Sequence, residues 1–316
     1  MNQLINFDDC EPAFRFYGGA EKKGAIIYNG KNYLLKFPKS PKIKNDLNSS
    51  YTNNVFSEYI CCHIIHTLNI PVQNTLLGTK NGKIVVACED FTSENEKLYE
   101  FFKFENSYLE KDSNSKHTEL YDALEIIDNH ERILNKSEYK KYFWDMFVVD
   151  AFIGNFDRHT GNFGFLVNEK EHITKPSPIY DCGSCMYPAL SDDVLSGILV
   201  SEEEINMRIY DFPNSSFTIN KQKINYYDFM INSDLSEFKE AVLKIVPNID
   251  LNKIDDIIDE TPELSNVRNK FYKTMIRERY EKILLPVYRK IYEKEILDLT
   301  DDEQQTIIPA PRSRGR

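Results

Sequence analysis

The amino-terminal part of the chain alternates between apolar and polar positions in short runs, which predicts strands arranged around one helix. Residues 25–28 and 31–37 alternate as strands do, and Asn29-Gly30 between them is a strong signal for a type I′ turn. Apolar residues recur at helical spacing over 52–68, so a helix is predicted there. Two further strands are predicted after this helix, at 74–78 and 83–88.

After about residue 92 the apolar residues take the wider spacing of helices. Helices are predicted at 119–127, 137–153, 233–246, 251–259 and 265–297. The last helix is predicted to kink at Pro286, because proline lacks the amide donor of the helical hydrogen bond. Residues 163–167 are typical of a strand, whereas the acidic segment after Pro188 is predicted to be a loop.

These elements predict an α+β protein with two lobes. A β-rich lobe with one helix is expected over 1–91, with a hinge near its end. A mostly helical lobe is expected over 92–300, followed by a disordered tail over 301–316. The order of hairpin, helix and second hairpin is typical of the amino-terminal lobe of a protein kinase.

The segment Gly154–Asn162 carries the strongest signal for chemistry. It places Asp157 and Asn162 five residues apart, and Asp181 follows the apolar pair Ile179-Tyr180. Protein kinases use a carboxylate and an amide at this step, and a second carboxylate after a hairpin. The first carboxylate reaches the acceptor hydroxyl, while the amide and the second carboxylate hold Mg²⁺. The spacing predicts Asp157 as the catalytic base and the other two residues as Mg²⁺ ligands. For the segment alone, a plain loop rich in Asn, Asp and Gly is the alternative.

A lysine and a glutamate complete the predicted nucleotide site. Lys36 lies near the end of a strand, where protein kinases place the lysine that neutralises the α- and β-phosphates of ATP, and it shares a strand face with Leu34. Glu58 lies on the apolar side of the helix over 52–68, where a carboxylate is costly unless it is paired. We predict that Glu58 pairs with Lys36. The alternatives are a solvated strand lysine and an ordinary exposed glutamate.

Two further candidates for nucleotide binding carry weaker signals. The pair Gly18-Gly19 precedes a polar stretch, and its backbone amides are candidates to cover the phosphates, although glycine pairs are also common in ordinary turns. His159 follows the predicted base within the same loop. It is either a second acid or base or a hydrogen-bonding residue that shapes the loop, and we favour the second role because Asp157 already satisfies the need for a base.

The cysteines do not predict a site of their own. The chain has six, including the adjacent pair Cys61-Cys62, and this number does not indicate a disulfide framework at 316 residues. Cys182-Gly-Ser-Cys185 has the spacing of a redox or metal pair, but it lacks a thioredoxin context and a second such motif for zinc. Cys62, His63 and His66 have a helical spacing that zinc can use. We favour packing roles for both groups.

Composition and charge narrow the choice of partners. The chain carries 50 acidic against 39 basic residues, a formal net charge of −11, which disfavours nucleic acid and anionic membranes as partners. No apolar run approaches the roughly 20 residues that cross a bilayer, and the amino terminus lacks the features of a signal peptide. We therefore expect a cytoplasmic protein, and delivery to a host stays open.

The motifs resemble those of a known family. Residues 155–162 (Asn-Phe-Asp-Arg-His-Thr-Gly-Asn) and 180–184 (Tyr-Asp-Cys-Gly-Ser) are similar to the N-x-D-R-H-x-x-N and Y-D-x-x-S motifs of HipA-like serine/threonine kinases. Within that family the chain looks most like the short CtkA-type (cell-translocating kinase A) members, in stretches such as 83–88 and 181–185. The resemblance runs from about residue 7 to residue 285.

This resemblance implies a protein-kinase-like fold, ATP and Mg²⁺ as cofactors, and a protein substrate with a Ser or Thr acceptor. It assigns the base to Asp157, the metal ligands to Asn162 and Asp181, and an ATP contact to Lys36. HipA toxins also carry an additional amino-terminal subdomain that is used with a DNA-binding antitoxin. This chain begins at the kinase lobe, so an antitoxin partner stays open.

HipA kinases silence themselves by phosphorylating a serine in the loop that covers the nucleotide. Between Glu11 and Lys39 this chain has no Ser or Thr, so that switch is expected to be absent. We expect autophosphorylation to fall on Ser or Thr of other loops or the tail and to leave the kinase active. The candidates are Ser49, Ser50, Ser191 and Ser313.

Two other functions fit parts of the pattern. A phosphoinositide-type lipid kinase has a similar Asp-Arg-His-x-x-Asn loop, but an inositide headgroup needs several cations, and no basic segment follows Asp181. A kinase-shaped binding module would lack key catalytic residues, and here the base, both metal ligands and the lysine are present. Consumption of ATP by the pure protein, with and without Mg²⁺, separates an enzyme from a binding module.

Overall fold

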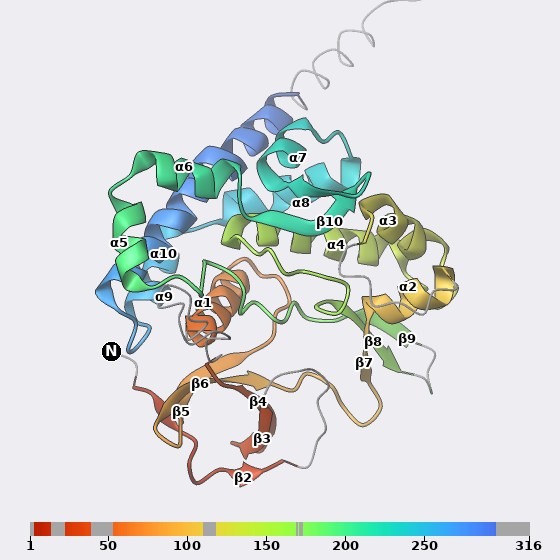
Figure 1. The fold of residues 1–316 in the computed structure, drawn as a ribbon. Coiled ribbons are helices and arrows are strands. Elements are labelled where there is room, and N and C mark those ends of the chain that lie inside the picture. The colour runs from red at the N-terminus through yellow and green to blue at the C-terminus, as the bar shows by residue number, and fades with distance from the viewer. Residues whose placement is uncertain are drawn as a thin grey trace, which may run out of the picture.

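The structure is a computed structural model, and it describes residues 3–13, 23–38, 53–109, 118–168, 170 and 173–294. A six-stranded sheet lies at one end of the molecule and most helices gather at the other, with the first helix, α1, between them (Figure 1). This arrangement confirms the predicted α+β class. The lobe boundary at residue 91 stays a prediction, and the tail over 301–316 lies outside the described residues.

The six-stranded sheet contains both predicted hairpins. Its strands are β1 (Ile5–Asn6), β2 (Glu11–Pro12), β3 (Lys23–Tyr28), β4 (Lys31–Lys36), β5 (Thr75–Lys80) and β6 (Lys83–Glu89), in the order β1-β5-β6-β4-β3-β2. Strand β1 runs parallel to β5, and the other neighbours are antiparallel. Asn29-Gly30 and Asn81-Gly82 close the two hairpins with positive φ at all four residues, as a type I′ turn requires.

The two faces of β4 meet different cores. Tyr33 and Leu35 pack with Phe7 in a small apolar core on one face of the sheet. Leu34 packs against the main core on the other face. Lys36 has the same parity as Leu34 and is 9% exposed. The alternation therefore turns this lysine away from solvent and toward the body of the protein, as the sequence predicted.

Helix α1 (Asn54–Thr67) joins the sheet to the helical part. It contacts β5 and β6, and it also contacts α9 (Leu251–Asp259). Because it is covered on several sides, most of its residues are buried and it has no broad polar face. A residue on α1 is therefore positioned by both parts of the molecule at once.

The helical part is built around α4 (Lys136–Ile153), whose second half is almost entirely buried. Besides α9 and two helices described below, this part contains α2 (Phe101–Leu109), α3 (Leu120–Asn129), α7 (Tyr226–Asn232), α8 (Ser236–Ile245) and α10 (Asn266–Arg279). Trp144 of α4 stacks on Phe229 at 5.9 Å between ring centroids and meets Phe238 edge-on. These aromatic contacts fix α4 against α7 and α8.

Strand content in this part exceeds the prediction. The strand predicted at 163–167 is confirmed as β8 (Gly164–Asn168), which pairs with β7 (Lys97–Glu100) and β9 (Ile173–Pro176). A separate hairpin, β10 (Asn214–Ile219) with β11 (Gln222–Asn225), was not predicted. These strands are short and lie between helical segments, so local periodicity gives little signal for them.

The prediction of a loop after Pro188 is wrong. The segment holds α5 (Asp192–Leu199) and α6 (Glu202–Tyr210). The hydroxyl of Ser191 accepts a hydrogen bond from the amide of Val194, and Ser201 accepts one from Glu204. These are N-cap contacts, and the acidic residues of each first turn favour the positive end of the helix dipole. The acidic clusters are therefore helix starts.

Two predicted helices also differ in detail. The helix predicted at 233–246 begins at Ser236, because Ser233 instead ends α7 with its amide bonded to the carbonyl of Phe229. The last predicted helix is α10, a π-helical turn at Tyr280–Leu284 and a further helical stretch to residue 294. Pro286 lies two residues after the end of the π turn, and its missing amide interrupts the regular hydrogen bonds there.

Gly164 in β8 offers a test of the close packing between β7 and β8. A Cβ at this position would lie 2.2 Å from the carbonyl oxygen of Tyr99. We expect Gly164→Ala to lower the free energy of unfolding by about 1–3 kcal/mol, because the strands must move apart. Gly197 in α5 has nothing within 4 Å of such a Cβ. Gly197→Ala should instead stabilise the protein by up to about 1 kcal/mol, and urea unfolding of both variants checks the difference.

Candidate active site

The predicted catalytic segment begins at the end of α4. Gly154 ends this helix in the left-handed conformation, with φ of 66°. The chain therefore turns back on the last helical turn. The amide of Asn155 donates to the carbonyl of Asp150 at 2.9 Å, and its side-chain amide donates to the Asp150 carboxylate at 2.8 Å. The segment is thus anchored to the helix from its first residue.

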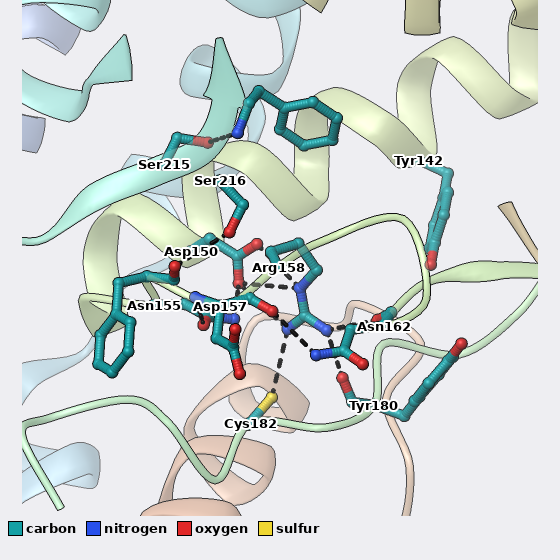
Figure 2. Close-up of polar contacts among 12 residues, drawn as sticks. Tyr142, Asp150, Asn155, Asp157, Arg158, Asn162, Tyr180, Cys182, Ser215 and Ser216 are labelled. Carbon is teal, nitrogen blue, oxygen red and sulfur yellow. Dashed lines mark hydrogen bonds and ion pairs between the residues drawn. The ribbon is translucent and has the colours of Figure 1, made fainter. Parts of the chain in front are cut away.

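The side chain of Arg158 anchors residues 154–162 through buried hydrogen bonds. Its Nε lies 3.0 Å from Asp150 Oδ2 and its Nη2 lies 3.1 Å from Oδ1, and both side chains are at most 2% exposed. Its Nη1 donates to the carbonyl of Asn162 at 2.7 Å and also to the carbonyl of Tyr180 (Figure 2). Burial raises the pKa of Asp150, and the guanidinium opposes that rise. One buried cation therefore joins α4, the segment 154–162 and the residue before Asp181.

Asp157 lies between these two loops and is half-buried. Its backbone amide donates to Asn155 Oδ1 at 3.0 Å. Its Oδ2 accepts a hydrogen bond from the hydroxyl of Ser184 at 3.2 Å. The carboxylate is therefore oriented by a residue three positions after Asp181.

Asn162 is buried beside Asp157. Its side-chain amide nitrogen donates to the backbone carbonyl of Asp157 at 2.8 Å (Figure 2). Because the nitrogen is used in this way, the side-chain oxygen Oδ1 is the atom directed elsewhere, and it is a hard oxygen donor. The hydroxyl of Tyr180 donates to the carbonyl of Gly161 at 3.2 Å, a second link between the two loops.

The lysine, the glutamate and the second carboxylate meet at one point. Lys36 Nζ lies 2.9 Å from Glu58 Oε2 and 2.7 Å from Asp181 Oδ1. The predicted contact between Lys36 and Glu58 is confirmed. The side chain of Glu58 is 1% exposed and that of Asp181 is 42% exposed. Gly183 passes close to Glu58, since a Cβ on it would lie 2.9 Å from Oε2.

Charge and burial compete in this trio. Burial opposes the charge of Lys36, but Asp181 and Glu58 outweigh it and raise the pKa of the lysine well above its usual range. Burial raises the pKa of Glu58 to about 7, while Lys36 opposes the rise and Asp181 adds to it. Lys36 is therefore charged at neutral pH, whereas Glu58 changes its protonation state close to neutral pH.

The remaining predicted residues are placed as follows. His159 Nδ1 accepts a hydrogen bond from the amide of Gly161 at 3.1 Å, and its ring would lie 3.0 Å from a Cβ on that glycine. This contact shapes the loop, which is the role that the sequence analysis favoured. Gly18 and Gly19 lie outside the described residues, so their role stays a prediction.

Sequence reasoning missed the residues that position the site. Asp150 is the one carboxylate among the apolar residues 146–153 at the end of α4, and the cost of burying it was the available signal for a partner. Arg158 was read only as part of a motif. Ser184 was noted only as the last residue of the Y-D-x-x-S motif, and its contact with Asp157 could not be predicted because it depends on how the two loops meet.

The raised pKa of Glu58 has a consequence for stability. In the unfolded chain Glu58 titrates near 4.5, so between about 4.5 and about 7 the folded state binds more protons than the unfolded state. Its contribution to the free energy of unfolding must then fall as pH rises through this window. We expect the stability of the wild type, relative to Glu58→Gln, to fall by on the order of 2–3 kcal/mol between pH 4.5 and 7.5. Urea unfolding at both pH values measures this difference.

The exposed residue Glu203 on α6 provides the control for this prediction. Glu203→Gln removes the same charge from a solvated position, and its stability relative to wild type should change little with pH. Equal pH dependence in the two variants would contradict a buried, proton-binding Glu58.

Comparison with known proteins places this site in a family. A serine/threonine-protein kinase, CtkA of Helicobacter pylori, is 45% identical over 285 residues, which are 89% of this chain and 86% of that protein. The crystal structure of a Helicobacter pylori proinflammatory kinase CtkA matches with a TM-score of 0.87 and 42% identity, over 92% of this chain and 98% of that chain. A complex of HipA, HipB and operator DNA from Shewanella oneidensis MR-1 gives a TM-score of 0.48 at 15% identity, over 91% of this chain and 75% of that chain.

The family match agrees with the site. The family described as the HipA-like C-terminal domain matches residues 16–262, a range that includes every predicted site residue. The close structural match shows that the α+β fold is kinase-like. The chain therefore belongs to the HipA-like family and is a protein kinase of that family.

Proposed function

We propose that this kinase transfers the γ-phosphoryl group of ATP to Ser or Thr hydroxyls of a protein substrate, and that it requires Mg²⁺. The observation that carries the proposal is the position of Lys36 between the carboxylates of Glu58 and Asp181. The loop that carries Asp181 is in turn hydrogen-bonded, through Ser184, to Asp157. The lysine, the two carboxylates and the base are the parts that phosphoryl transfer uses. The serine/threonine-protein kinase relative supports the choice of acceptor.

Asp157 is proposed as the catalytic base. Its carboxylate accepts a hydrogen bond from Ser184, and its backbone is fixed by Asn155 and Asn162. A carboxylate held in this way can accept the proton of an acceptor hydroxyl as that oxygen attacks the γ-phosphorus. Positioning is the main contribution that the protein makes to this step, because the transition state is loose.

The donor set of Asn162 and Asp181 fits Mg²⁺. Both supply oxygen atoms, since the nitrogen of Asn162 is engaged with Asp157. Two protein ligands are enough for this ion, which keeps several waters and shares the phosphate oxygens of its nucleotide. When bound, Mg²⁺ offsets the negative charge that develops on the phosphoryl oxygens.

Lys36 is proposed as the phosphate contact. Of its two carboxylate partners, Glu58 is buried and Asp181 is partly exposed. Asp181 is therefore the partner that can turn toward a metal ion, while Glu58 keeps the ammonium in place. Backbone amides of Gly18 and Gly19 are proposed to cover the phosphates.

Autophosphorylation is proposed to fall outside the covering loop. Of the four candidate serines, Ser191 is described, and its hydroxyl caps α5 through the amide of Val194. The other three lie outside the described residues.

Within the described part of the chain, no helix is long and apolar enough to cross a membrane. A cytoplasmic location stays a prediction.

Removal of the base provides the first test. We expect Asp157→Asn to reduce kcat for phosphoryl transfer by about 10²–10⁴-fold, because the amide cannot accept the proton. Its unfolding should stay close to that of the wild type, since the asparagine side chain has a similar shape. Asp193→Asn, on the exposed face of α5, is the matched control and should keep full activity. Near-normal turnover by Asp157→Asn would refute the assignment of the base.

Metal titration separates the ligand from the lysine. Asn162→Ala should be partly rescued by raised Mg²⁺, because its defect is weakened binding of the cation. Lys36→Met keeps the apolar stem of the side chain but removes the positive charge that faces the phosphates. Extra Mg²⁺ should therefore not restore the activity of this variant. Initial rates over a range of Mg²⁺ concentrations at saturating ATP measure this contrast. Equal rescue of both variants would refute the division of roles.

A further inference from the structure

An exposed aromatic ring lies beside the candidate active site. The side chain of Phe212, just after α6, is 43% exposed. Its ring centroid lies 5.6 Å from that of Phe156, the residue before Asp157. It also lies 5.9 Å from the ring of Tyr187, on the loop that carries Asp181. Phe212 therefore contacts residues from both loops of the site, and neither contact buries it.

The position of this ring is fixed by hydrogen bonds of the backbone. The amide of Phe212 donates to the carbonyl of Met207 at 3.1 Å, and its carbonyl accepts a hydrogen bond from the hydroxyl of Tyr187 at 2.6 Å. The carbonyl of Phe156 accepts one from the hydroxyl of Ser216 at 2.9 Å. A surface held in this way loses little conformational freedom when a ligand packs on it, so it is preorganised for binding.

The exposed apolar surface continues onto α6, where it is flanked by acidic residues. Met207 is 42% exposed. Glu203 and Asp211 lie four residues before and after it, so they share its face of the helix, and both are exposed. Glu204 is paired with Arg208 at 2.6 Å, whereas no ion pair between described residues includes Glu203 or Asp211. The face is therefore apolar at its centre and negatively charged on both sides.

The location of this surface indicates what covers it. Exposed apolar side chains are ordinary when they are scattered, but Phe212 and Met207 adjoin each other and border the residue next to the proposed base. An acceptor hydroxyl that reaches Asp157 brings its neighbouring residues to this border. An extended segment advances roughly 3.3 Å per residue, so a side chain one or two positions from the acceptor can reach Phe212.

We propose that Phe212 and Met207 bind a large apolar side chain of the protein substrate, one or two residues from its Ser or Thr acceptor. Glu203 and Asp211 favour Lys or Arg elsewhere in the same segment, because the charges are complementary. The occupant is thus a short, extended, basic segment of the substrate. This selection of sequence rests on the proposed transfer to a protein hydroxyl.

The test measures phosphoryl transfer from ATP by the full-length protein to short synthetic peptides with one central serine. In one set, the residues beside the serine are alanine or leucine. In a second set, lysine or glutamate stands further out. We expect kcat/KM to be about 10-fold higher with leucine than with alanine, the low end of what an apolar contact discriminates. Lysine should be preferred to glutamate, and added salt should weaken that preference.

Matched variants locate the selection on this surface. Phe212→Ala should reduce the preference for leucine to about 2-fold or less, mainly through a higher KM for the leucine peptide. Met207→Ala removes a second side chain of the surface and should weaken the same preference. Glu203→Lys should remove the preference for lysine. Tyr121→Ala truncates a ring on α3 that is 55% exposed, and this control should keep both preferences. Urea unfolding checks that each variant is folded.

The outcomes separate this assignment from the proposed function. Equal use of leucine and alanine peptides by the wild type, or an unchanged preference in both Phe212→Ala and Met207→Ala, would overturn the assignment and leave the function standing. Consumption of ATP without transfer to any peptide would also overturn it, because a short segment would then not suffice. Failure to consume ATP in the presence of Mg²⁺ would refute the proposed function itself.

A second copy of the chain is the other occupant to test. Light scattering of the wild type and of Phe212→Ala measures the oligomeric state of each. We expect both to have the same mass. A wild-type dimer that Phe212→Ala dissociates would show that the surface joins two copies, and it would contradict the binding of a substrate segment there.

Discussion

The buried ion pair between Arg158 and Asp150 is the interaction on which the active site depends. Burying two charges is expensive, and their attraction repays the cost only when the remaining donors are also satisfied. Here the guanidinium meets the carboxylate through two nitrogens and uses a third for the carbonyls of Asn162 and Tyr180. Those acceptors belong to three separate segments. The pair therefore fixes geometry more than it adds stability, because the positions of Asp157 and Asp181 both follow from it.

The helix end that carries Asp150 is held from its other side by a second buried arginine. Arg279 of α10 is 3% exposed and lies close to Gly154. Its Nε donates to the carbonyl of Ala151 at 2.7 Å, and its Nη1 donates to the carbonyl of Arg208 at 3.1 Å. These carbonyls lie in the last turns of α4 and α6, where backbone oxygens lack helical partners and the helix dipole favours a cation. The charge of Arg279 is thereby compensated by helix ends.

Sequence predicted those parts of the site that depend on local spacing or on the cost of burial. The Asn29-Gly30 turn specified the first hairpin, and the apolar setting of Glu58 required a cationic partner, which is Lys36. The prediction failed where two signals competed or where proximity arises only in three dimensions. The acidic residues near Ser191 and Ser201 were read as loop, although each serine caps a helix. No local pattern relates Ser184 to Asp157, because their contact depends on how the two loops meet.

The charges gathered at the site give a physical reason for the proposed dependence on Mg²⁺. Arg158 is neutralised by Asp150, so it offers little positive charge to a nucleotide. Two carboxylates, those of Glu58 and Asp181, then flank the single ammonium of Lys36, and Ser184 links a third carboxylate, that of Asp157, to the loop of Asp181. In a chain of net charge −11, no general positive field offsets this excess. A polyphosphate entering alone would meet repulsion that strengthens as the surroundings become less polar. Under the proposed function, a divalent cation held by Asp181 would offset that repulsion, and the metal would then serve the binding of the nucleotide as well as the transfer of its phosphoryl group.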